Sequence, residues 1–291
     1  MTELRDRAVA LYDAFTHDHH DRRTLLKQMT ALAGSVAAAE ALILGIAASP
    51  AVAAVIDPAD PRLHTEWKTG SEAGKAARAY VAAPAKAKGK RGTVLVIHEN
   101  RGLTPHIQDV ARRVALAGFT AIAPDLLAPQ GGTPTDEDRA RTLIGTIDYD
   151  LALAQAASMM AQARAQPGAT GKAGIVGFCW GGAFVNQFAI SAGADLAAGV
   201  AYYGPAPAAA NAVRVKTPLM LHYAGKDARV AATGESWVAA LKAAHKPVEA
   251  FTYPGVDHAF NNDTSAERYD AAAAALAWGR TIAFLHKHLD A

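Results

Sequence analysis

A cysteine flanked by glycines forms the strongest chemical pattern in the chain. Cys179 lies within Gly177-Phe178-Cys179-Trp180-Gly181-Gly182, directly after an apolar run and directly before a predicted helix. A nucleophile on such a sharp strand-to-helix turn has a strained backbone, and glycines two residues before and after it avoid a steric clash. The dipole at a helix N-terminus also favours thiolate over thiol. We therefore expect Cys179 to be a reactive nucleophile, with a core cysteine beside a tight turn as the alternative.

A thiol nucleophile needs a base, and an acid and a histidine follow Cys179 in the chain order that α/β-hydrolases use. Asp227 comes just after the apolar run 218–223, and His258 just after the run 248–253. Parallel strands deliver the loops at their carboxyl ends to one edge of a sheet. We expect Asp227 and His258 to meet Cys179 at that edge. Taken alone, Asp227 also fits a turn residue and His258 an ordinary loop histidine.

The elements that must position these residues are visible from Arg62 onward, where short β-branched runs alternate with longer helical stretches. This alternation is the signature of βα units around a mainly parallel sheet. The run 93–97 is apolar throughout, as a strand buried on both faces must be. A helix over 105–116 follows it, with Gly118 as the stop signal. We predict an α/β-hydrolase fold with helices on both faces of the sheet and strands over 93–97, 119–123, 174–178, 198–203, 218–223 and 248–253.

Two segments before the first central strand have their own predictions. Residues 77–82 read as an antiparallel strand at the edge of the sheet. Residues 86–91 are basic and contain a glycine, and we predict a solvated hairpin turn there.

The first 54 residues differ in character from the rest. Arg22-Arg23 and two leucines precede an alanine-rich apolar stretch that ends in Ala51-Val52-Ala53. This layout resembles a twin-arginine export signal with small residues at a cleavage site. We predict residues 1–54 as an export signal that engages the twin-arginine machinery and leads to the periplasm or beyond, and 55–291 as the hydrolase domain. The alternative is a cytoplasmic protein whose N-terminus is a helical arm that packs on a partner or membrane.

Composition excludes several classes of function. The chain has 291 residues, of which 51% are hydrophobic and 19% charged, so it can bury a large core and is not disordered. A net charge of +2 without any block of like charge makes nucleic acid an unexpected partner. The single cysteine excludes an intramolecular disulfide.

We expect neither a metal nor a cofactor from the sequence. The cluster from His17 to His20 specifies no coordination geometry. His98 and Glu99 are neighbours on a strand, so their side chains point to opposite faces. Residues 168–172 lack the glycine and hydroxyl spacing of a phosphate-binding loop.

The chain resembles the dienelactone hydrolase family from about Thr65 to His286. The resemblance rests on the cysteine-bearing turn and on three further motifs: Gly225-Lys226-Asp227, Gly255-Val256-Asp257-His258-Ala259-Phe260 and Val96-Ile97-His98-Glu99-Asn100-Arg101-Gly102. It implies an α/β-hydrolase that cleaves a lactone or carboxylic ester. It also implies that Glu99 contacts the resting thiol and takes its proton when substrate arrives. A surface glutamate is the alternative for Glu99.

Position along the chain suggests the remaining site residues. The backbone N–H groups of Trp180 and Asn100 are expected to form the oxyanion hole. Well-known members of the family bind a substrate carboxylate with an arginine four residues after the catalytic histidine, where this chain has Asn262. Arg101, Arg139 or Arg141 could supply that positive charge instead. Tyr202 and Tyr203 follow a strand at the same edge, where they either line the pocket or belong to the core.

Three hypotheses follow for the function. The first is a hydrolase that uses Cys179, His258 and Asp227 and forms an acyl-thioester intermediate with a small-molecule ester or lactone. The second is a non-catalytic protein that keeps the fold and binds a ligand. The third is a thiol redox sensor, which the absence of a second, resolving cysteine in the chain disfavours. The sequence does not fix the oligomeric state.

Overall fold

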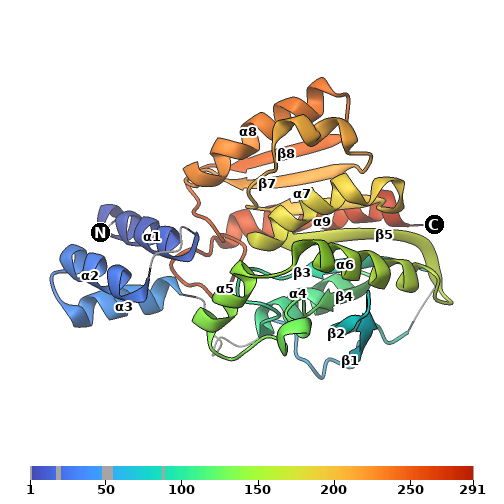
Figure 1. Cartoon of the computed structure of the whole chain (residues 1–291), viewed down its shortest axis with the longest axis horizontal. Coiled ribbons are helices and arrows are strands. Elements are labelled where there is room, and N and C mark those ends of the chain that lie inside the picture. Colours follow the sequence, from blue (N-terminus) through green and yellow to red (C-terminus); the bar gives the residue numbers. More distant parts are fainter. Residues whose placement is uncertain (1, 18–20, 48–54, 87–88, 291) are drawn as a thin grey trace.

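A single eight-stranded sheet forms the centre of the computed structural model, which describes residues 2–17, 21–47, 55–86 and 89–290 (Figure 1). The strand order is β1-β2-β4-β3-β5-β6-β7-β8. The strands are β1 (Leu63–Glu72), β2 (Lys75–Pro84), β3 (Arg91–Ile97), β4 (Thr120–Pro124), β5 (Ala169–Phe178), β6 (Ala198–Tyr202), β7 (Leu219–Ala224) and β8 (Val248–Tyr253).

All neighbouring strands from β4 to β8 are parallel, whereas β1–β2 and β2–β4 are antiparallel. Each of the six predicted central strands is present, with ends that differ by a few residues. The α/β-hydrolase fold class is therefore confirmed. Cys179, Asp227 and His258 each come after one of these parallel strands. The carboxyl ends of parallel strands lie at one edge of the sheet, so the three residues share that edge.

The predicted edge strand over 77–82 is antiparallel, but its edge position is wrong. It forms part of β2, and β1 covers its outer side over the full length of both strands. The two strands are joined by Ala73 and Gly74, both with positive φ (50° and 73°), as a tight right-twisted hairpin requires. Most side chains of β1 are exposed, so its sequence lacks the apolar run by which the central strands were predicted.

The predicted hairpin turn over 86–91 is also wrong in part. The segment joins β2 to β3, and these strands are not neighbours because β4 lies between them. Lys86 and Lys90 are exposed, while residues 87 and 88 lie outside the described part of the chain. The segment is thus a crossover connection and not the turn of a hairpin.

Helices cover both faces of the sheet and give the molecule two apolar cores. One core contains side chains of α4 (Pro105–Leu116) and α9 (Ala271–Leu289). The other contains side chains of α6 (Tyr149–Arg164), α7 (Trp180–Ser191) and α8 (Ala228–Ala243). A shorter helix, α5 (Glu137–Gly145), and the 3₁₀ turns η1 (Ala128–Gln130), η2 (Gly193–Asp195) and η3 (Ala209–Arg214) complete the connections. The predicted helix 105–116 matches α4.

Three helices precede the sheet: α1 (Thr2–His17), α2 (Arg22–Ala33) and α3 (Val36–Ile46). Figure 1 shows them together in blue at one end of the molecule, close to α5. They share a small core that includes Tyr12, Phe15, Leu25, Met29 and Ile46. Asp21 and Ser35 cap α2 and α3 by accepting hydrogen bonds from backbone N–H groups.

The predicted signal-peptide features fall partly on these helices. The paired arginines begin α2, and the predicted cleavage stretch 51–53 lies outside the described residues. Within the described ranges no single helix is long and apolar enough to cross a membrane. Only α2 and α3 taken together meet that length and composition, and a bend of 111° separates them. Export and cleavage stay predictions.

Candidate active site

The turn between β5 and α7 holds Cys179 in a strained conformation, with φ 55° and ψ −113°. The adjacent glycines are required by close backbone contacts. A Cβ atom on Gly177 would lie 2.1 Å from the carbonyl oxygen of Gly181, and one on Gly181 would lie 2.5 Å from that of His98. No side chain fits at either position without moving the backbone. The turn thus has the geometry of the nucleophile elbow that the sequence predicts.

The structure brings Asp227 and His258 together beside this turn. Asp227 follows β7 and caps α8 by accepting a hydrogen bond from the Val230 N–H at 3.0 Å. Its other carboxylate oxygen lies 2.5 Å from Nδ1 of His258, which is almost completely buried. One nitrogen of His258 lies within 4.8 Å of the sulfur of Cys179. The neighbouring carboxylate of Asp257 points elsewhere and pairs with Arg5 at 2.9 Å.

The two buried partners of His258 set its charge. Burial disfavours the charged imidazolium, but a negative sulfur on Cys179 and the hydrogen bond and charge of Asp227 outweigh burial and raise the pKa of His258 to about 10. Burial likewise opposes ionisation of Asp227, yet the hydrogen bond from His258 lowers the pKa of this carboxyl below its ordinary value. The arrangement therefore favours an imidazolium held against the carboxylate of Asp227.

Glu99 lies in the loop after β3 and is buried. Its carboxylate accepts a hydrogen bond of 2.9 Å from the side-chain amide of Asn262. Glu99 and Cys179 line the same small cavity of about 20 Å³, together with His258. Asn262 thus holds Glu99 in place and does not itself line the described cavities beside Cys179.

The predicted oxyanion-hole residues flank the sulfur. Trp180 is the first residue of α7, so its backbone N–H has no acceptor within the helix. Asn100 lines both cavities that reach Cys179, and its side-chain amide donates to the carbonyl oxygen of Thr16 at 3.1 Å.

The two predicted pocket tyrosines have different surroundings. Tyr202 is a core residue, because its hydroxyl lies 2.7 Å from that of Thr281 and it lines neither cavity beside Cys179. Tyr203 is also a core residue that lines neither cavity, but its ring lies 5.0 Å from that of His258, and among the described residues its buried hydroxyl has no hydrogen-bond partner. Burial and the negative charges of Glu99 and Cys179 raise the pKa of Tyr203 well above its ordinary value, so this hydroxyl stays protonated.

Helix α1 lies across the site, which the sequence did not predict. The Nε2 atom of His17 is 4.0 Å from the sulfur of Cys179, and its ring packs edge-on against His258 at 4.7 Å. Burial and the positive charges of His258, Arg229, Arg268 and Arg101 lower the pKa of His17 well below its ordinary value, so this imidazole is neutral.

Helix α1 also contacts three arginine side chains near Cys179. Arg101, a predicted substrate contact, donates to the Tyr12 hydroxyl and pairs with Glu137 at 3.3 Å. Arg268, which the sequence reading did not single out, pairs with Asp13 at 3.3 Å. Arg141 lies 3.9 Å from the centre of the Phe15 ring. No residue type or spacing in 1–17 signals these contacts, because Tyr12 and Arg101 are 89 positions apart and Asp13 and Arg268 are 255 positions apart.

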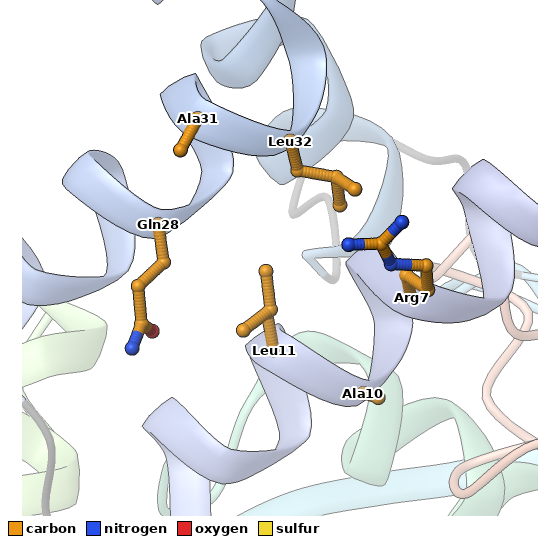
Figure 2. Close-up of a pocket in the computed structure, with 6 residues that line it drawn as sticks. All are labelled: Arg7, Ala10, Leu11, Gln28, Ala31 and Leu32. Atoms are coloured by element: carbon orange, nitrogen blue, oxygen red, sulfur yellow. The ribbon is translucent and has the colours of Figure 1, made fainter.

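A cavity of about 390 Å³ opens beside Cys179 and Trp180. Its walls include Thr16 and His17 of α1, and it is otherwise mainly apolar, with two arginines. The remaining lining residues are Asn100, Arg141, Ile144, Gly145, Ile147, Tyr149, Ala183, Pro205 and Arg229. Its volume is within the range of small-molecule sites. A second hollow of about 500 Å³ lies between α1 and α2 (Figure 2), but none of the candidate catalytic residues lines it.

The cysteine turn and the buried His258–Asp227 pair both lie in the part of the chain that matches a known family. Residues 77–289 match the model of the dienelactone hydrolase family. The chain belongs to the dienelactone hydrolase family. It is therefore a hydrolase of carboxylic esters or lactones, as the sequence predicts.

Named relatives and solved structures agree with this assignment. The chain is 30% identical over 257 residues to a "Putative carboxymethylenebutenolidase" of Escherichia coli, covering 83% of this chain and 94% of that one. It is also 30% identical over 214 residues to a carboxymethylenebutenolidase of Pseudomonas putida, covering 71% and 89%. The crystal structure of a "Putative Dienelactone Hydrolase" from Klebsiella pneumoniae superposes with a TM-score of 0.72 at 31% identity, covering 78% of this chain and 99% of that one.

Proposed function

We propose that this hydrolase acts by nucleophilic catalysis, with Cys179 as nucleophile, His258 as acid and base, and Asp227 as the group that orients the imidazole. The observation that carries the proposal is the buried contact between Asp227 and His258 at 2.5 Å beside a strained cysteine at the start of a helix. A fixed imidazole next to a sulfur at a helix N-terminus is the arrangement that activates a thiol.

The reaction then takes place in two halves. The thiolate of Cys179 attacks the carbonyl carbon, and the electron pair of the C=O bond moves to the oxygen, which the N–H groups of Trp180 and Asn100 stabilise. When this oxyanion collapses, the ester C–O bond breaks and the leaving alkoxide takes the proton of the His258 imidazolium. Neutral His258 next removes a proton from water, whose oxygen attacks the thioester carbonyl and releases the acid and the thiolate.

Glu99 is proposed to control when the thiol ionises. A carboxylate beside a thiol disfavours a free thiolate until substrate displaces it or takes up its charge. Asn262 supports this role because its amide donates to Glu99 and so fixes the carboxylate in the small cavity that Cys179 also lines. Asn262 stands where well-known family members have an arginine. Here its side chain holds Glu99 and supplies no positive charge.

The cavity beside Cys179 supports a substrate class. Its walls are mainly apolar, which favours a compact acyl or lactone group, and Arg229 contributes a buried guanidinium nitrogen that has no hydrogen-bond partner among the described residues. An unpaired buried donor is costly unless a ligand satisfies it. We therefore propose an ester or lactone that carries a carboxylate or another strongly polar acceptor, with Arg229 as its contact.

The test is a panel of aryl esters and lactones, each in a neutral and a carboxylate-bearing form. Cys179→Ala and His258→Ala are expected to lose at least roughly a thousandfold in kcat, because residues of a catalytic unit fail together. The wild-type protein should show an acyl adduct on Cys179 by mass spectrometry after rapid quenching. Arg229→Gln should raise KM for the carboxylate-bearing member of each pair and leave that for the neutral member within about twofold, since it removes charge and little volume.

The competing hypotheses give different results in the same experiments. Wild-type turnover in the Cys179→Ala protein would remove the nucleophile assignment. A binding protein would hydrolyse none of the panel, and a redox sensor would show peroxide-dependent oxidation of Cys179 without turnover.

A further inference from the structure

A third side chain joins the proposed catalytic pair at the centre of the site. The sulfur of Cys179 and one imidazole nitrogen from each of His17 and His258 all lie within 4.8 Å of one another, and the His17 nitrogen is 4.0 Å from the sulfur. The three residues come from the end of α1, the turn before α7 and the loop after β8. The fold therefore assembles one thiol and two imidazoles that no motif in the sequence connects.

The orientation of His258 points to a ligand. Its Nε2 atom is buried and, among the described residues, has no hydrogen-bond partner. Its Nδ1 atom is held by the carboxylate of Asp227 at 2.5 Å. A histidine that ligates a metal usually donates its other ring N–H to a carboxylate in this way, which fixes the tautomer and raises the basicity of the free nitrogen. The Nε2 atom faces the space between Cys179 and His17, and it becomes a metal ligand when the ion displaces its proton.

The distances approach those of a tetrahedral site and would have to contract around an ion. Zinc lies about 2.3 Å from a thiolate sulfur and about 2.0–2.1 Å from an imidazole nitrogen, so tetrahedral ligand atoms are roughly 3.3–3.6 Å apart. The ligand atoms of the three residues lie within 4.8 Å of one another, and the His17 nitrogen is 4.0 Å from the sulfur. The cavity of about 20 Å³ that all three residues line has room for the ion, and a water as fourth ligand would approach from the larger cavity that His17 and Cys179 also line.

The positive charges that lower the pKa of His17, those of Arg229, Arg268 and Arg101 among them, oppose a cation, and carboxylates offset two of them. Arg101 and Arg268 line this small cavity, and each is paired with a carboxylate at 3.3 Å, Glu137 and Asp13 respectively. Glu99 adds a further carboxylate to the same wall. One thiolate and two imidazoles form a donor set that suits zinc and is unsuited to magnesium or calcium, which prefer oxygen ligands.

We propose that His17, Cys179 and His258 form a zinc site, with the fourth position open to water, and that zinc bound there reversibly inhibits the hydrolase and fastens α1 across its active site. The ion binds the sulfur of Cys179 and the imidazole nitrogen of His258, and the proposed hydrolysis needs both atoms free. It also joins α1 to the two loops that carry the catalytic pair. Metal binding depends on where the three side chains lie and not on Cys179 being the nucleophile, so a direct binding measurement distinguishes failure of this inference from failure of the proposed mechanism.

The experiment uses the full chain, zinc chloride and cobalt chloride as a spectroscopic probe. Cobalt should bind one ion per chain and give an intense thiolate-to-metal absorption band in the near ultraviolet, which zinc displaces and Cys179→Ser abolishes. Zinc should lower ester turnover, and a chelator should restore it. Absence of the band at millimolar cobalt, or its persistence in Cys179→Ser, would overturn the site.

Variants of the N-terminal arm test the third ligand. His17→Ala should weaken zinc binding at least about tenfold, because even supporting residues of metal sites contribute that much. His17→Cys keeps a zinc ligand and should bind within about tenfold of the wild type, which separates loss of a ligand from displacement of the helix. The matched control is the double variant His19→Ala/His20→Ala, expected to bind as the wild type. Unchanged affinity in His17→Ala, loss in both His17 variants, or loss in the double variant would each contradict the proposal.

Discussion

Replacing Asp227 with asparagine tests the catalytic geometry with the smallest change of shape. The carboxylate of Asp227 lies 2.5 Å from Nδ1 of His258, and both side chains are buried. A hydrogen bond to a charged group contributes about 1.5–3 kcal/mol, so its loss lowers kcat/KM roughly 10- to 150-fold. An asparagine amide that donates to Nδ1 would also hold the wrong imidazole tautomer, which makes this range a lower bound.

The same variant has a signature in its pH profile. Asp227 is one of the groups that raise the pKa of His258 to about 10, in opposition to burial. An imidazolium is present below its pKa and is lost as the pH rises through it. Removing the charge of Asp227 lowers that pKa, so the alkaline limb of kcat/KM against pH should move to lower pH. The assay is turnover of an aryl ester between pH 6 and 11, with blank rates subtracted because such esters hydrolyse in base.

Asp257→Asn is the matched control for Asp227→Asn. Asp257 is the sequence neighbour of His258, and the structure pairs it with Arg5 and not with the imidazole. Arg5 is partly exposed, and a pair of this kind contributes up to about 1 kcal/mol. We expect kcat/KM within about fivefold of the wild type and an unmoved alkaline limb. Equal losses in the two variants, or an Asp227→Asn protein with more than half of wild-type activity, would refute the reasoning.

Three further predictions rest on single contacts, and a fourth concerns the N-terminus. Glu99→Gln should speed alkylation of the thiol by iodoacetamide, because it removes a negative charge while keeping the acceptor for Asn262; an unchanged rate would contradict the role of Glu99. Gly181→Ala should lower the free energy of unfolding in urea by about 1–3 kcal/mol, since its Cβ would lie 2.5 Å from a backbone carbonyl oxygen; wild-type stability would contradict the close contact. Tyr203→Leu should lower kcat more than Tyr202→Leu, because only the Tyr203 ring contacts His258; the reverse order would exchange their roles. N-terminal sequencing of protein from the native host should find Ala54 or Val55 first if the export signal is cleaved, and an intact N-terminus would remove that prediction.

The sheet was predictable because the positions of its central strands are determined by local composition. The strand around Val94 to Val96 is buried on both faces, and continuous apolar character identifies it without knowledge of its neighbours. The strand β1 was missed because it has one neighbour and exposed side chains, so its sequence lacks that signal. The prediction that β2 lies at the edge of the sheet was wrong because β1, which was missed, pairs with its outer side.

The catalytic pair was predictable because parallel strands place loops that are far apart in sequence at one edge. Asp227 and His258 each follow a strand by a few residues, and the direction of those strands determines where the loops meet. His17 could not be placed by this rule because α1 is not part of the βα alternation. Its position depends on side-chain contacts such as Asp13 with Arg268, whose partners carry no pattern that relates them. Tyr202 and Tyr203 were ambiguous because a strand end borders both the core and the pocket, and both side chains belong to the core.

Export and catalysis depend on the same N-terminal segment. If it is cleaved as an export signal, its helix α1 cannot also cover the active site of the mature chain. Cleavage after residue 53 or 54 removes α1, and with it the His17 and Thr16 walls of the cavity beside Cys179. It also removes Tyr12 from Arg101, which keeps its pair with Glu137, and Asp13 from Arg268, so the buried cation of Arg268 would become free to contact a substrate carboxylate. A processed enzyme should therefore have a wider, more cationic pocket and no third zinc ligand, whereas an unprocessed one keeps a closed pocket that zinc can fasten. Zinc sensitivity of ester turnover thus reports which form a preparation contains, independently of where in the cell the protein is found.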